Sequence, residues 1–130
     1  MPTLRQLRDR RSKAFGRTGE DLAAAHFERL GLRVLARNYR TRWGELDLVL
    51  TDEAERMIVF CEVKTRRLGS GEPWDNLHDD KRRRVRKMAA AWLTEVDDRP
   101  RAAELRFDAV GVTVDARGVL VRLDHLEAAF

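Results

Sequence analysis

Cysteine and long apolar runs are scarce in this sequence, and each absence excludes a class of protein. One residue of the 130 is cysteine, so neither an intramolecular disulfide nor a zinc site built on several cysteines can form. No apolar stretch reaches the length that spans a membrane, and the first ten residues lack the apolar core of a secretory signal. We therefore expect a protein of the reducing cytoplasm that is neither membrane-spanning nor exported by that route.

The chain also has few prolines, no internal repeat and no linker-like tract. Its 130 residues suit a single domain, and an apolar content of 43% is ample for one hydrophobic core. We expect residues 1–130 to form one domain, in which residues 1–12 are a basic, partly mobile N-terminal segment.

Positive charge is concentrated in two blocks, although the formal net charge is only +4. Residues 1–17 carry six Arg or Lys against one Asp, and residues 81–87 carry six basic side chains in seven positions. Each block is either a phosphate-binding surface or a solvated helix face and basic tail. Charge pattern alone does not separate these two interpretations.

Apolar residues that recur at helical spacing from Phe15 to Leu30 predict a first helix that ends at Gly31, and a second helix is predicted with one buried stripe. The stripe consists of Val85, Met88, Ala89, Trp92, Leu93 and Val96. Strands are expected at residues 32–39, 45–50, 57–65 and 105–114, with a fifth after the turn at residues 115–118. The order α-β-β-β-α-β-β predicts an α/β domain.

Acidic residues recur on the second and third predicted strands. Because strand side chains alternate, Glu45 and Asp47 should share one face, with the neighbouring leucines 46, 48 and 50 on the other. A turn near residues 52–55 should place Asp47 opposite residue 60 or 62. Asp47, Glu62 and Lys64 then converge at one end of a hairpin, bordered by the apolar side chains Val49, Ile58 and Phe60.

Two neighbouring carboxylates raise each other's proton affinity, and a divalent cation relieves their repulsion. Mg²⁺ is the expected ion, with Mn²⁺ as a substitute, because it binds carboxylate and carbonyl oxygens and keeps several waters. The Val63 carbonyl can supply a further oxygen, and Lys64 can orient a nucleophile or offset charge in the transition state. This pattern predicts hydrolysis of a phosphodiester.

The same residues resemble the YraN-type bacterial proteins, which are similar to the restriction-endonuclease-like superfamily with its Asp…Glu-X-Lys signature. The strongest match pairs Gly-Glu-Leu-Asp-Leu-Val at residues 44–49 with Glu-Val-Lys-Thr-Arg at residues 62–66. Further matches lie at residues 16–20, 37–40, 60–61, 81 and 106–108. The loop at residues 69–77 departs from the usual pattern, which leaves substrate preference open.

This resemblance implies a mixed sheet of about five strands flanked by helices, similar to Holliday-junction resolvases in fold and site. It implies that Asp47 and Glu62 are metal ligands, that Lys64 is the catalytic lysine, and that Glu20 is a further acidic site residue with a place among the ligands. The alternatives are a cross-strand ion-pair cluster for the first three and a helix-dipole interaction for Glu20. Glu45 either joins the site or pairs with an arginine.

Six basic residues near the motif strands or on the second helix are the expected nucleic-acid contacts: Arg40, Arg42, Arg66, Lys81, Arg82 and Arg86. Trp43 and Trp74 lie in predicted loops and can stack on bases, whereas Trp92 belongs to the core. We expect Asp108 to anchor a buried arginine or backbone group. The three histidines are not clustered in sequence, which argues against a histidine metal site.

The favoured function is a Mg²⁺-dependent endonuclease acting on nucleic acid, with DNA the preferred substrate. One alternative is a non-catalytic nucleic-acid-binding module of a repair, recombination or uptake complex, which predicts salt-sensitive binding without cleavage. Another is a structural protein whose acidic cluster only stabilises the hairpin. A homodimer is a further hypothesis, testable by light scattering at several concentrations.

Overall fold

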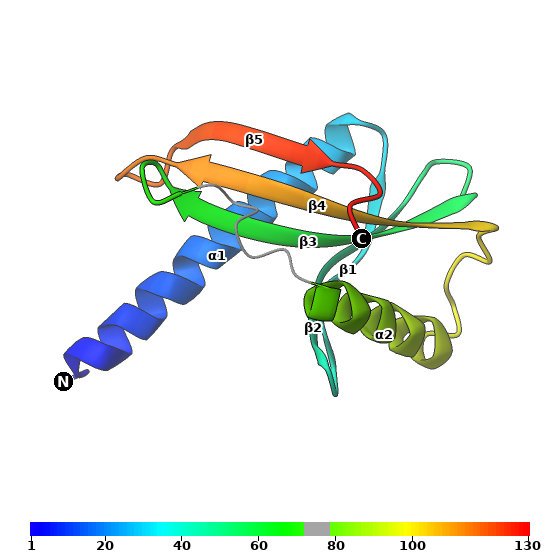
Figure 1. Ribbon diagram of the computed structural model, residues 1–130, viewed down its shortest axis with the longest axis horizontal. Helices are drawn as coiled ribbons and strands as arrows, with labels where there is room; N and C mark the ends of the chain where they lie inside the picture. Colours follow the sequence, from blue (N-terminus) through cyan, green and yellow to red (C-terminus); the bar gives the residue numbers. More distant parts are fainter. Residues whose placement is uncertain (72–78) are drawn as a thin grey trace.

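The protein folds as one five-stranded sheet with a helix on each face (Figure 1). The computed structural model describes residues 1–71 and 79–130. For residues 8–17 and 79 it describes the backbone alone. Sheet order follows chain order, and β3 and β4 alone are parallel because α2 forms the crossover between them. The predicted order of elements and the mixed α/β sheet are confirmed. The elements are α1 (Leu4–Arg29), β1 (Arg33–Thr41), β2 (Gly44–Thr51), β3 (Met57–Arg67), α2 (Asp79–Glu95), β4 (Glu104–Val114) and β5 (Leu120–Leu126).

Helix α1 begins earlier than its apolar spacing predicts. Thr3 caps it: the hydroxyl accepts a hydrogen bond from the Gln6 N–H, and the Thr3 N–H donates to the Gln6 side chain. Residues 4–12 are therefore helical, while the partial mobility of this segment stays a prediction. The helix ends before Gly31, whose φ of +88° suits a residue without Cβ.

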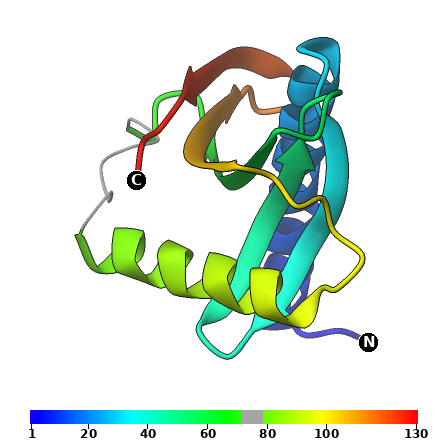
Figure 2. The same cartoon turned by 90° about the vertical axis from the view of Figure 1, so that its right-hand side faces the viewer.

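The two helices cover opposite faces of the sheet. Ala23, Ala24 and Phe27 of α1 pack on Leu48 and Leu50, together with buried residues of β3 and β4. The predicted stripe of α2 packs on the other face, against Val49, Ile58 and Phe60, and Trp92 is buried there as expected. Figure 2 shows α2 crossing the β1–β2 hairpin on the side away from α1.

Strands β2 and β3 separate part of the way along, which creates a fork in the sheet. They pair from Thr51 and Ile58 to Leu48 and Cys61. Beyond that point, within the described residues, β2 continues with β1 to the hairpin tip, and β3 continues with β4 as far as Arg67. Extending the register places Asp47 opposite Glu62, in agreement with the prediction.

The expectation that Leu46 shares a face with Leu48 and Leu50 is wrong. Leu46 packs in the α2 cluster, whereas the other two pack beneath α1. The physical reason is the fork, because a two-stranded ribbon twists more strongly than a full sheet. Between Leu48 and the hairpin tip, the side chains of β2 are therefore rotated relative to those in the rest of the sheet, and Leu46 faces α2.

Among the described residues, none of the helices combines the length and the apolar character needed to cross a membrane.

Candidate functional site

Asp47 lies at the fork and bridges the two diverging strands. Its Oδ2 accepts a hydrogen bond of 2.8 Å from the Val63 N–H, so a side chain continues the hydrogen bonding where the β2–β3 ladder ends. Burial and the Glu62 carboxylate raise the pKa of Asp47 to about 8, against the effects of the Val63 N–H and Lys81. The environment of the fork thus favours the protonated form of this carboxyl group.

Glu62 is the direct partner of Asp47. The Glu62 carboxylate acts on Asp47 both through its charge and through a side-chain interaction, and both effects raise the pKa of Asp47. Neither joins a salt bridge with a cation in the part of the chain that the structure describes. Asp47 and Glu62 are therefore neighbouring carboxyl groups of like charge and not members of a cross-strand ion pair.

Gly19 allows α1 to approach β3 closely enough to bring Glu20 to the fork. A Cβ at Gly19 would stand 1.8 Å from the Thr65 hydroxyl oxygen, so no larger residue fits without movement. Burial and Asp47 raise the pKa of Glu20, while a hydrogen bond from the Asn38 side chain opposes that rise. Its Oε2 is buried without a hydrogen-bond partner among the described residues. An acceptor oxygen is thus available beside the Asp47–Glu62 pair.

Three cations surround the carboxyl groups. Lys64 follows Glu62 by two residues on β3, and its pKa is lowered by burial and by Arg66 and Lys81, against the attraction of Asp47 and Glu62. Lys81, in the first turn of α2, also acts on Asp47, and its charge lowers the pKa of that carboxyl group. Arg66 has a buried Nε without a hydrogen-bond partner among the described residues. These cations can receive an anionic group placed over the carboxyls.

The donor set suits a hard divalent cation held by few protein ligands. Among the described residues, no three His, Cys, Asp or Glu side chains converge into a complete metal-binding group. Mg²⁺ does not require one, because it commonly binds one or two carboxylates and completes its shell with water and phosphate oxygens. The Asp47–Glu62 pair and the Glu20 oxygen that lacks a hydrogen-bond partner among the described residues fit that requirement. A role for the Val63 carbonyl stays a prediction, since the structure engages the Val63 N–H.

The remaining basic residues are spread over two elements. Arg40 pairs with Glu45 at 3.1 Å, which matches the alternative considered for Glu45. The Arg42 guanidinium lies 4.6 Å from the Trp43 ring centroid, and Arg82 is exposed at the start of α2. Arg86 is engaged by the Phe130 carbonyl at 2.8 Å and by the Phe107 ring. Trp74 lies outside the described residues, as does the third histidine, His78.

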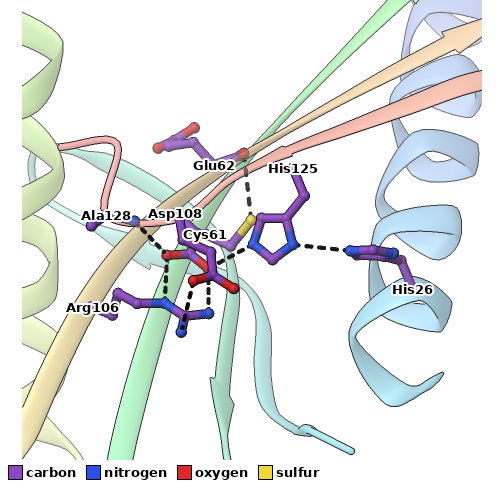
Figure 3. Close-up of polar contacts among 8 residues, drawn as sticks. His26, Cys61, Glu62, Arg106, Asp108, His125 and Ala128 are labelled. Carbon is purple, nitrogen blue, oxygen red and sulfur yellow. Dashed lines mark hydrogen bonds and ion pairs between the residues drawn. The ribbon is translucent and has the colours of Figure 1, made fainter. Parts of the chain in front are cut away.

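A second polar cluster joins α1, β4 and β5 (Figure 3). The buried Asp108 accepts hydrogen bonds of 2.8 Å from Arg106 and from His125, and one of 3.1 Å from the Ala128 N–H. The other ring nitrogen of His125 lies 3.0 Å from Nε2 of His26. The prediction that Asp108 anchors an arginine or backbone group is confirmed. His26 and His125, which are 99 residues apart in the sequence, meet here because β5 returns along the sheet to the end of α1.

Asn38 is the site residue that the sequence analysis missed. It lies on β1 between the pairs Arg37↔Leu48 and Tyr39↔Leu46, hence across from Asp47. Its φ of +52° is left-handed, a conformation that asparagine tolerates better than most residues, and its side chain reaches Glu20. An asparagine in a strand, where its propensity is poor, was the available signal.

Comparison with known proteins gives consistent matches. The family model described as uncharacterised protein family UPF0102 matches residues 19–112. A UPF0102 protein of Frankia casuarinae is 44% identical over 125 residues, covering 93% of this chain and 99% of the relative. A UPF0102 protein of Mycobacterium sp. (strain KMS) is 43% identical over 114 residues, which cover 87% of this chain and 82% of the relative. A UPF0102 protein of Acidothermus cellulolyticus is 52% identical over 84 residues, which cover 64% of this chain and 62% of the relative. The chain therefore belongs to the UPF0102 family.

Proposed function

We propose that this chain is a divalent-metal-dependent nuclease that hydrolyses phosphodiester bonds in nucleic acid, with DNA as its favoured substrate. The observation that carries the proposal is the Asp47–Glu62 pair at the fork, two neighbouring carboxyl groups that form no salt bridge among the described residues although lysines lie nearby. A cluster that served only to stabilise the hairpin would neutralise its carboxylates with cations, because buried like charges cost stability. Such a costly arrangement is typical of functional sites.

The side chains divide into ligands and charge-stabilising groups. Asp47 and Glu62, with Glu20 beside them, would hold Mg²⁺ or Mn²⁺, which when bound polarises a phosphate oxygen and lowers the pKa of water. Lys64, two residues after Glu62 on β3, can orient an attacking water or offset charge on the phosphate. Lys81 and Arg66 stand where they can receive the neighbouring phosphate oxygens.

The assignment to the restriction-endonuclease-like superfamily is part of the same proposal. It is supported by the mixed sheet, by the hairpin that carries Asp47 ahead of Glu62 and Lys64, and by the helix that contributes Glu20. The similarity to Holliday-junction resolvases adds branched DNA to the substrates to be tested.

The test compares wild type with Lys64→Ala, purified identically. End-labelled single-stranded, duplex, flapped and four-way-junction DNA is incubated in Mg²⁺, Mn²⁺ or EDTA. Glu53→Gln is the matched control, because Glu53 is an exposed residue of the β2–β3 turn. The expected result is cleavage that needs metal, persists in Glu53→Gln and disappears in Lys64→Ala.

Cleavage that is equal in wild type and Lys64→Ala would come from a contaminant and would count against the proposal. Salt-sensitive binding with no cleavage of any substrate would replace it with the non-catalytic binding module.

A further inference from the structure

A groove lies between the tip of the β1–β2 hairpin and the outer side of α2. Its volume is about 430 Å³, and it is open to solvent. Its lining comprises Arg42, Trp43, Lys87, Ala90, Ala91, Thr94 and Glu95. The close approach of hairpin and helix forms it, since Gly44 of the hairpin faces the Met88 sulfur of α2. The groove is thus built from two elements that also position the candidate site.

The chemistry of the lining selects a flat, apolar group attached to an anion. Trp43 and two alanines supply an aromatic and apolar surface, and Arg42 is already stacked on the Trp43 ring. The carboxylate of Glu95 is occupied by the Tyr39 hydroxyl, whereas no ion pair engages Arg42 or Lys87 among the described residues. An aromatic surface with free cations at its rim is how proteins bind unpaired bases with their phosphates.

We propose that this groove binds an unpaired nucleobase of a nucleic acid whose phosphodiester backbone continues to the Asp47–Glu62 fork. Trp43 precedes Asp47 by four residues on the same strand ribbon, a separation of roughly 13 Å at the rise of a β-strand. Lys81, which acts on Asp47, and Lys87, which lines the groove, lie less than two turns apart on α2. The inference rests on the proposed function, and it names the substrate class as DNA with a single-stranded segment beside the cut.

The test measures binding without turnover, by fluorescence anisotropy of the full chain in EDTA. The probes are a blunt duplex and the same duplex with a short single-stranded overhang. Trp43→Ala and Lys87→Glu change the groove, and Trp43→Phe keeps an aromatic ring. Arg117→Glu is the charge control for Lys87→Glu, because Arg117 is exposed in the β4–β5 turn far along the chain from both motifs.

Wild type should bind the overhang probe more tightly than the blunt duplex. Trp43→Ala should weaken overhang binding by about 5-fold to 100-fold, the range for loss of one base stack, and leave blunt-duplex binding within about twofold. Trp43→Phe should retain most of the preference. Lys87→Glu alters an exposed side chain and does not disturb packing. It should also lower the ratio of the affinity for the overhang probe to the affinity for the blunt duplex, whereas Arg117→Glu should leave this ratio unchanged.

Equal affinities of wild type for both probes would overturn the inference, as would a Trp43→Ala variant that keeps the overhang preference. Competition by polyglutamate as strong as that by single-stranded DNA would also overturn it, in favour of an acidic protein segment. The two proposals fail separately. Overhang selectivity without metal-dependent cleavage removes the nuclease alone, and cleavage with unchanged selectivity in Trp43→Ala removes the groove alone.

Discussion

Replacing Asp47 with asparagine should stabilise the metal-free protein at alkaline pH, although it removes a candidate ligand. The amide keeps an oxygen that can accept from the Val63 N–H, and its NH₂ group can donate to the neighbouring Glu62 carboxylate. The substitution therefore removes the charge and retains the contacts.

The magnitude follows from the pKa of Asp47, which is raised from 3.8 to about 8. Each pKa unit corresponds to about 1.4 kcal/mol, so full ionisation costs the fold at most about 5–6 kcal/mol. We expect Asp47→Asn to raise the free energy of unfolding by about 2–5 kcal/mol at pH 8.5, because the amide recovers part of that cost.

The folded-state pKa lies above the unfolded-state value, so the folded protein holds the proton to higher pH. Wild-type stability attributable to this group is therefore present near pH 4 and is lost as the pH rises through about 8.

The assay is urea unfolding followed by circular dichroism, in EDTA, from pH 4 to pH 9. Asp98→Asn, a change at an exposed residue, is the matched control. The stabilisation by Asp47→Asn should shrink toward zero near pH 4. Adding Mg²⁺ at ten times its dissociation constant should stabilise wild type by about 1.4 kcal/mol and the variant by less. A variant that is less stable than wild type at pH 8.5, or a difference that does not change with pH, would refute the reasoning.

Three further substitutions test the parts of the structure that support the site. Gly19→Ala should lower the free energy of unfolding by about 1–3 kcal/mol, because its Cβ would overlap the Thr65 hydroxyl, and Thr65→Ala should restore part of the loss in the double variant. Burial and His125 lower the pKa of His26, so its contribution to the free energy of unfolding declines as the pH falls below about 6.5. When urea unfolding is measured across this pH range, the His26→Gln variant should lack that part of the decline. Asp108→Ala should cost about 3–5 kcal/mol in urea unfolding, because it removes the buried carboxylate that accepts from Arg106, His125 and the Ala128 N–H; a loss below 1 kcal/mol would contradict that role.

Local patterns in the sequence predict much of the fold. The α2 stripe, the two motif strands and their antiparallel pairing follow from apolar periodicity and turn residues, and the register follows from the turn length. The start of α1 was predicted too late because a capping box, which Thr3 and Gln6 form, determines it more than apolar spacing does.

The contacts that sequence reasoning missed depend on tertiary geometry. Leu46 changes cluster because the sheet forks, which a single-strand alternation does not show. His26 and His125 meet across 99 residues, and Asn38 reaches Glu20 because Gly19 lets α1 settle on β3. In each case strand divergence or close packing brings together side chains that no local spacing connects.

We propose that the Asp47–Glu62 pair performs metal-dependent hydrolysis. The most direct test of this proposal is the single-turnover cleavage rate of Glu62→Gln and Glu53→Gln against wild type in Mg²⁺, on the DNA structure that wild type cleaves fastest. Glu62→Gln preserves shape and removes one ligand charge, so the account predicts a loss of at least about 100-fold, with DNA binding in EDTA retained and Glu53→Gln equal to wild type. A Glu62→Gln rate within a few-fold of wild type would contradict the account.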